Sequence, residues 1–235
     1  MNSMTAKLCG VLALMLLVPG AVLAQLPAVG SATGINAAFV KLFGSISAFS
    51  ARVDTLVFDK SQQEAVRMPM DFAALDNNIR LGINLEQTTS KDLPASTIAA
   101  LKQAGMDRII SLFRPDKKAT FVLYPNSKTY VVLPLTKGEA EALEKGLTME
   151  KTALGKETLD DHACVKNNVV VKNQQQTVLE ATTWNAADLE DFPIQIEMKG
   201  KEGTVRMRFK QIRLAKPDAK QFEVPTDYTL TTLTQ

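Results

Sequence analysis

Hydrophobic and polar residues alternate along most of the chain, and this period of two is typical of β-strands with one face on a core and the other in solvent. Two alternating stretches, 66–75 and 79–87, are separated by the turn-forming sequence Asp-Asn-Asn at 76–78, which predicts a hairpin. The hydrophobic face of this hairpin includes Met68, Met70, Phe72, Leu81 and Ile83.

A second hairpin is predicted near the C-terminus, where 192–199 and 204–212 alternate on either side of the sequence Gly-Lys-Glu-Gly. Its hydrophobic face carries Ile194, Ile196, Met198, Met207 and Phe209. The opposite face carries a basic row formed by Arg206, Arg208 and Lys210. We interpret this row as the solvent face of a sheet, and contact with an anionic partner or a membrane surface is the alternative.

Further short strands are predicted between these hairpins, among them one at 119–125, whose Phe121 we assign to the same hydrophobic face. Helical spacing is confined to short segments near 35–43, 95–106 and 136–146. Because strands and helices do not alternate, a parallel sheet is not expected. The sequence therefore predicts a mainly β protein of the α+β type, with about ten antiparallel strands and a few short helices.

The N-terminus has the features of a secretory signal peptide. Lys7 supplies the positive charge, and the apolar run at 8–18 is too short to span a bilayer. We place cleavage after residue 24, which makes 1–24 the signal peptide and 25–34, rich in small residues, a flexible arm. Residues 35–235 then form a single domain of a soluble, periplasmic protein that is not integral to the membrane.

The charge balance and the cysteine content narrow the class of protein. The chain has 27 Lys and Arg against 25 Asp and Glu, a net charge of +2. This near-balance argues against a nucleic-acid binder, which concentrates basic residues. Cleavage removes Cys9 and leaves Cys164 as the one cysteine, so no internal disulfide can form and packing must hold the fold together.

His162 and Cys164 stand two residues apart, a spacing that places them on the same face of a strand. A metal site would need two more ligands, and the chain has no other histidine. A catalytic Cys–His pair normally joins two separate elements of the fold. We therefore predict that both residues are structural, and that Cys164 is a small buried side chain.

Sequence motifs of catalysis are missing, among them G-x-S-x-G, the phosphate-binding glycine loop and H-E-x-x-H. Acidic pairs such as Glu139 and Glu141 fall in short helical stretches, where solvation or helix capping accounts for them. No catalytic residue, metal or cofactor is predicted, and the protein is not expected to be an enzyme.

Four groups of residues follow one another in a characteristic order and spacing. They are Tyr124-Pro125 with Lys128 and Tyr130; Gly155, Glu157 and Cys164 with Lys166; Trp184 with Phe192-Pro193; and Phe222, Pro225 and Tyr228. In this order they resemble an exported bacterial domain family of uncharacterised function, which is similar to the periplasmic lipoprotein carrier superfamily with the LolA/LolB-like fold. The resemblance covers residues 45–230.

The resemblance implies a curved antiparallel sheet that forms a half-open barrel with short helices as a lid. In the carriers, the concave hydrophobic face encloses acyl chains of a lipoprotein. One function is therefore the enclosure of a lipid, lipoprotein acyl chain or other hydrophobic ligand by the hydrophobic face defined above, as in lipid or lipoprotein transport. The other is a protein-interaction or envelope-stress sensor module with a filled core and an envelope protein as partner, since inward methionines serve a cavity or a core equally well.

Overall fold

The computed structural model describes residues 37–90, 93–174, 176–200 and 203–231. The predicted signal peptide, 1–24, and the predicted arm, 25–34, lie outside the described residues. Within the described part, no helix has the length and the hydrophobicity that a membrane crossing requires.

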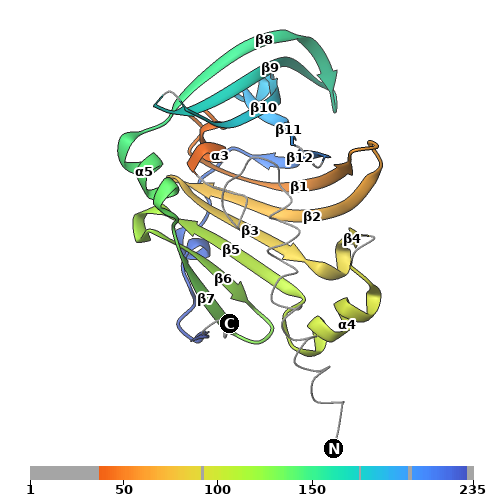
Figure 1. Ribbon diagram of the computed structural model, residues 1–235, viewed down its shortest axis with the longest axis vertical. Helices are drawn as coiled ribbons and strands as arrows, with labels where there is room; N and C mark the ends of the chain where they lie inside the picture. The colour runs from red at the N-terminus through yellow and green to blue at the C-terminus, as the bar shows by residue number, and fades with distance from the viewer. Residues whose placement is uncertain (1–36, 91–92, 175, 201–202, 232–235) are drawn as a thin grey trace, which may run out of the picture.

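The described residues form one thirteen-stranded sheet (Figure 1). Its first seven strands are β1 (Ala48–Asp59), β2 (Glu64–Leu75), β3 (Asn78–Asn84), β4 (Thr89–Ser90), β5 (Arg108–Arg114), β6 (Ala119–Tyr124) and β7 (Thr129–Pro134). The remaining strands are β8 (Thr148–Leu159), β9 (His162–Asn173), β10 (Gln176–Ala186), β11 (Phe192–Lys199), β12 (Gly203–Arg213) and β13 (Thr229–Leu230). The α-helices are α3 (Ala37–Lys41), α4 (Ala95–Gln103) and α5 (Lys137–Lys145), and the 3₁₀ turns are η1 (Leu85–Gln87), η2 (Pro115–Lys117), η3 (Ala187–Leu189) and η4 (Ala219–Phe222).

The strand order is β13-β7-β6-β5-β3-β2-β1-β12-β11-β10-β9-β8, with β4 paired to β2 beside this path. All neighbours are antiparallel except β13 and β7, which run parallel. The sheet curves strongly from β8 at the top of Figure 1 to β7 at the bottom, and these ends do not meet. The predicted fold class, a curved and unclosed antiparallel sheet with short helices, is confirmed.

Tight turns fix the register of the long hairpins. Asp76 and Asn77 join β2 to β3 with φ of 50° and 70°, and Asp160 and Asp161 join β8 to β9 with φ of 48° and 65°. Two successive residues with positive φ match the twist of the flanking strands, and Asn and Asp tolerate this conformation best after glycine. The hairpin predicted at 66–87 is confirmed with its turn at the predicted place, but its second strand ends at Asn84, directly before η1.

The pairing of β1 with β12 joins the first long strand to the last one and makes the sheet continuous. At one end of this pair, a side chain at Gly203 would place its Cβ 1.9 Å from the carbonyl oxygen of Phe58. Gly203 is therefore required for this close approach of β1 and β12. The hairpin of β11 and β12, predicted at 192–212, is likewise confirmed.

The C-terminal segment crosses the outer, convex face of the sheet after β12. Phe222 in η4 is buried against Ala73 and Leu75, which lie on the outer side of β2. Arg114, at the end of β5, donates hydrogen bonds to the carbonyl oxygen of Phe222 at 2.5 Å and to Glu223 at 2.7 Å. The segment is thus held to the sheet by one aromatic side chain and one buried guanidinium.

Candidate functional site

The inner, concave face of the sheet is a continuous hydrophobic surface. Residues that pair across antiparallel strands share a face, so the register defines its members. Met70 pairs with Ile83 and Phe72 with Leu81, while Val53 pairs with Phe209 and Ile196 with Met207. Ten of the eleven side chains predicted to line the hydrophobic face are no more than 6% exposed and belong to one core: Met68, Met70, Phe72, Leu81, Ile83, Ile194, Ile196, Met198, Met207 and Phe209.

Phe121 is the exception, and its assignment to the inner face was wrong. It pairs with Leu112 and Val132, and Leu112 pairs with Arg80, which places Phe121 on the outer face. The sequence of β6, Ala-Thr-Phe-Val-Leu-Tyr, is hydrophobic on both sides and carries no alternation that fixes its orientation. Pairing with β5 decides the orientation, and it turns Val122 inward instead.

One end of the inner face is closed by phenylalanine rings. They come from α3 and the residues after it, from β1 and β2, and from β11 and β12: Phe39, Phe43, Phe49, Phe72, Phe192 and Phe209. Neighbouring ring centroids lie 4.7 to 6.3 Å apart, most of them tilted or edge to face. Such contacts add to the stabilisation that burial of the rings provides. We call this group the phenylalanine end.

The adjoining part of the inner face carries methionines in place of rings. Thr55 pairs with Met68 on one neighbouring strand and with Met207 on the other, and its hydroxyl lies 4.0 Å from the Sδ of Met70. Met198 pairs with Val205 one step further along the face. Methionine side chains are unbranched and adapt their shape to what they contact. We call this group, with Met68, Met70, Met198 and Met207, the methionine end.

The pair His162 and Cys164 has the geometry of a structural feature. Cys164 is 2% exposed, its thiol donates to the carbonyl oxygen of His162 at 3.4 Å, and burial raises the pKa of the thiol. His162 instead pairs through Nδ1 with Asp188 at 2.7 Å, and this hydrogen bond lowers the pKa of the Asp188 carboxyl. A buried thiol with a raised pKa is a poor nucleophile. In the described ranges, no three His, Cys, Asp or Glu side chains come together as a metal site.

The basic row predicted on β12 lies on the outer face, and each of its members is paired with a carboxylate. Arg206 bonds Glu197 at 3.0 Å, Arg208 bonds Asp160 at 2.7 Å, and Lys210 bonds Asp54 at 2.7 Å. The interpretation of this row as the solvent face of a sheet therefore fits its surroundings.

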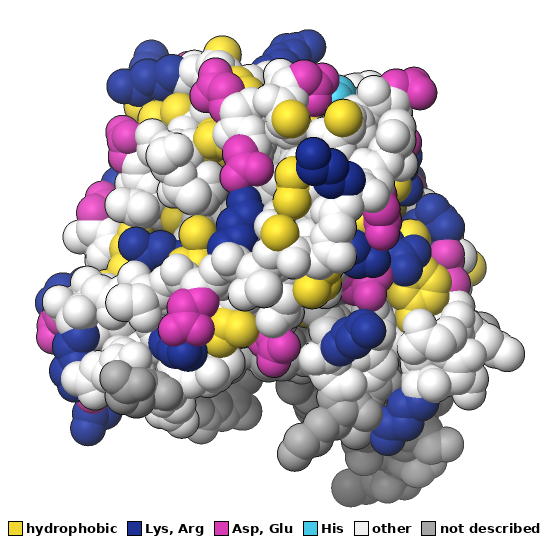
Figure 2. All heavy atoms as spheres, turned by 90° about the horizontal axis from the view of Figure 1, so that it is seen from above, with side chains coloured by type: hydrophobic (Ala, Val, Ile, Leu, Met, Phe, Trp, Pro, Cys, Tyr) yellow, Lys and Arg dark blue, Asp and Glu magenta, His cyan; other side chains and the backbone are white. Residues whose placement is uncertain are grey.

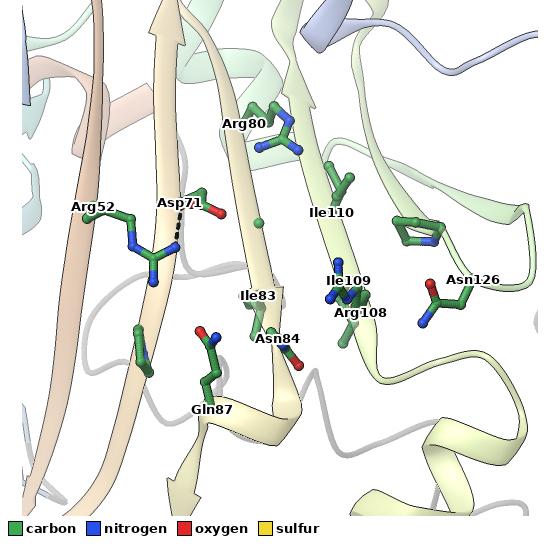
Figure 3. A pocket seen from close by; sticks show the side chains of 13 residues that line it. Arg52, Asp71, Arg80, Ile83, Asn84, Gln87, Arg108, Ile109, Ile110 and Asn126 are labelled. Atoms are coloured by element: carbon green, nitrogen blue, oxygen red, sulfur yellow. Dashed lines mark hydrogen bonds and ion pairs between the residues drawn. The ribbon is translucent and has the colours of Figure 1, made fainter.

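A groove of about 390 Å³ on the outer face of β1, β2, β3 and β5 is a second candidate site (Figure 3). Arg52, Asp71, Arg80 and Arg108 line it, and sequence analysis singled out none of them. The one local signal is Gly82, a glycine inside the strongly alternating strand β3, because such a glycine marks a close approach of other groups.

The sequence matches no family model and no curated protein. Among solved structures, a LolA superfamily protein from Nitrosomonas europaea is 12% identical, with a TM-score of 0.39 over 78% of this chain and 93% of that one. The lipoprotein LppX of Mycobacterium tuberculosis is 11% identical, with a TM-score of 0.39 over 74% of this chain and 90% of that one. The complex of Pseudomonas aeruginosa MucA and MucB gives 12% identity and a TM-score of 0.38 over 83% of this chain and 62% of that one. Similarities of this size concern the arrangement of strands, and they identify neither a ligand nor a partner of this chain.

Proposed function

We propose that this chain is a non-enzymatic binding protein of the bacterial periplasm, which encloses a lipid acyl chain or another hydrophobic ligand against its inner face. The observation that carries this proposal is the methionine end, a hydrophobic surface built from flexible side chains on the concave side of an unclosed sheet. Each methylene group moved from water to such a surface gains about 0.8 kcal/mol. Export to the periplasm rests on the signal peptide predicted at 1–24.

The division of the inner face supports a ligand at the methionine end in particular. At the phenylalanine end, rings of α3 and the strands already fill the space, with Phe43 in contact with Phe49, Phe72 and Phe192. At the methionine end, Thr55 is the one polar side chain among its immediate pairing partners, so an acyl chain there meets almost no unpaired polar group.

The second candidate function is a protein-interaction or envelope-stress sensor module with a filled core. The low exposure of the inner side chains favours it, since Met198 and Met207 are 1% and 2% exposed. The two functions differ in whether the methionine end is a ligand surface or permanent core.

Mass spectrometry of the chain purified from the periplasm without detergent, intact and after organic extraction, tests the proposal. Fatty acyl or phospholipid species in stoichiometric amount support enclosure of a hydrophobic ligand and identify its class. A protein that carries no such species, and gains no mass when incubated with palmitate, supports the interaction module instead.

A paired substitution locates the ligand. Met68→Phe with Met207→Phe adds two rigid rings on either side of Thr55, and we expect it to reduce palmitate binding by about tenfold, because overpacking fills the site. Val132→Phe, on the outer face at a side chain that is 38% exposed, is the matched control and should bind as the parent chain does. Equal palmitate binding by both variants would place the ligand away from the methionine end.

A further inference from the structure

The outer face of the central strands carries two adjoining grooves of about 390 and 330 Å³, which share Arg52, Asp71 and Arg80. Arg52 pairs with Asp71 across β1 and β2, and Asp71 pairs with Gly82 across β2 and β3. Figure 3 shows Arg52 and Asp71 joined by an ion pair, with Arg80 close by on β3 and Arg108 further along on β5. The grooves therefore form one surface over five neighbouring strands, from β12 to β5.

Positive charge is in excess along this surface. Its lining includes four arginines, Arg52, Arg80, Arg108 and Arg213, and among the described lining residues Asp71 is the single carboxylate. Asp71 bonds Arg52 at 2.7 Å. The other three arginines have no ion pair or side-chain hydrogen bond to another described residue. Three guanidinium groups are thus available to an anion.

Arg80 is the most strongly constrained of these arginines. It is half-buried, and burial lowers the pKa of its guanidinium while the charge of Asp71 offsets part of this effect. A Cβ placed on Gly82 would lie 3.3 Å from Nη1 of Arg80 and 3.5 Å from the Cβ of Asp71. Because Gly82 has no side chain, the guanidinium of Arg80 can lie close to the backbone of β3 at this position. A partly desolvated cation gains more from an added anion than a fully hydrated one.

Further along the outer face, on β9 to β12, several basic side chains already have acidic partners. Lys166, Lys172 and Arg206 each pair with a carboxylate within 3.0 Å. Seen from above the β8 end, basic and acidic side chains are intermingled over the surface (Figure 2). With a net charge of only +2 for the whole chain, the spare arginines concentrate positive charge on the central strands.

The spacing of the arginines indicates the shape of the ligand. Arg80, Ala73, Ser50 and Arg213 follow one another across four strands, so the bases of the two arginines are about 14 Å apart. Asn84 lies four residues, or about 13 Å, along β3 from Arg80. Arg108 pairs with Asn84 on the neighbouring strand β5. A single phosphate reaches one or two of these groups. An extended peptide, at about 3.3 Å per residue, crosses all of them with about eight residues.

We propose that this surface binds an acidic segment of a partner protein in extended conformation, with carboxylates bound by Arg80, Arg108 and Arg213. Guanidinium groups bind carboxylates through two parallel hydrogen bonds, which suits them to Asp and Glu side chains. Pro69, Ile110 and Pro125 in the lining give the backbone of such a peptide apolar contacts between the charged ones. The site lies on the opposite face from the methionine end and does not depend on the function proposed for it.

The test is fluorescence anisotropy with the full chain and a labelled peptide of roughly ten residues that alternates glutamate and alanine. The same peptide with glutamine in place of glutamate is the ligand control. We expect binding of the glutamate peptide that weakens as salt rises, and about tenfold weaker binding by Arg80→Gln, the usual loss for a charge-assisted hydrogen bond. Arg208→Gln, which removes an outer-face arginine that already has a partner, should leave peptide binding unchanged.

Two further variants separate geometry from charge. Gly82→Ala keeps every charge and has an ordinary backbone conformation, but its methyl group displaces the Arg80 guanidinium, so the glutamate peptide should bind more weakly. Arg80→Lys keeps the charge and loses the two-pronged geometry, and should fall between the parent and Arg80→Gln. Thermal melting confirms that each variant is folded, and palmitate binding reports the inner face separately.

The proposal is overturned by equal binding of the glutamate and glutamine peptides, or by equal losses in Arg80→Gln and Arg208→Gln. Binding of inorganic phosphate with no binding of the glutamate peptide would replace it with a small-anion site. Binding confined to vesicles of phosphatidylglycerol would replace it with a membrane-surface site.

Discussion

The two faces of the central strands differ in what holds their side chains in place. On β1, Val53 is fully buried, whereas the side chain of its neighbour Arg52 is 44% exposed and bonded to Asp71. On β3, Leu81 is buried among inner-face side chains while Arg80 lies across the outer face. The same strand pairings thus build a hydrophobic surface on one side and a charged one on the other.

This comparison separates stability from recognition by charge. Inner-face side chains gain free energy by leaving water, so their removal should be felt by the whole fold. Outer-face charges remain largely hydrated, so their removal should change ligand binding and pH or salt dependence more than stability. Three substitutions, ordered by expected effect, test this separation.

The largest effect is expected at the phenylalanine end. Phe72→Ala removes a ring that lies 5.4 Å from Phe49 and 5.6 Å from Phe209, and it should lower the free energy of unfolding by about 3–5 kcal/mol. Met70→Leu, two residues earlier on the same inner face of β2, conserves volume and should be tolerated within about 1.5 kcal/mol. Urea denaturation measures both. A smaller loss for Phe72→Ala than for Met70→Leu would contradict the role of the rings.

An intermediate effect is expected where a charge is buried on the outer side. The side chain of Arg114 is 8% exposed and bonds both carboxylate oxygens of Asp116, at 2.8 and 2.6 Å, as well as Glu223. Arg114→Leu should lower the free energy of unfolding by about 1–3 kcal/mol, a limited loss because the two carboxylates are half-exposed and stay hydrated.

The same substitution should change the response to acid. Hydrogen bonds from basic partners, Arg114 for Asp116 and chiefly Lys117 for Glu223, lower the pKa of both carboxyls in the folded state. A lowered pKa in the folded state stabilises the protein above the unfolded pKa, and this stabilisation is lost as pH falls below about 4. Arg114→Leu should therefore lose less stability than the parent between neutral pH and about pH 3, as followed by thermal melting. An unchanged pH dependence would mean that Arg114 contributes by packing alone.

Parts of the fold could be predicted because alternation is strict and turn residues mark its ends. This held for the hairpin around Asp76 and Asn77, and for that of β11 and β12. The orientation of β6 could not be predicted, because Phe121 and Val122 are both hydrophobic and the C-terminal segment covers part of the outer face. Local pattern determines a strand, but its register with the neighbouring strand determines which side faces inward.

The groove could not be predicted for a different reason. Arg52, Arg80 and Arg108 lie about 28 residues apart in the chain, and each alone fits the polar side of a strand. Pairing of β1, β2, β3 and β5 brings them to one surface. Which arginines find a carboxylate depends on that pairing, so a spare positive charge is a property of the tertiary structure.

The smallest effect is expected on the outer face of β12. Arg208→Gln breaks an ion pair with Asp160 in which the carboxylate side chain is 46% exposed, and it should change the free energy of unfolding by less than about 0.5 kcal/mol. Exposed pairs gain little because both charges are well hydrated when separated, and urea denaturation at low and high salt should give nearly the same small difference. A loss as large as that of Arg114→Leu would show that exposed outer-face ion pairs stabilise the sheet. It would contradict the assignment of stability to the inner face and of charge recognition to the outer face.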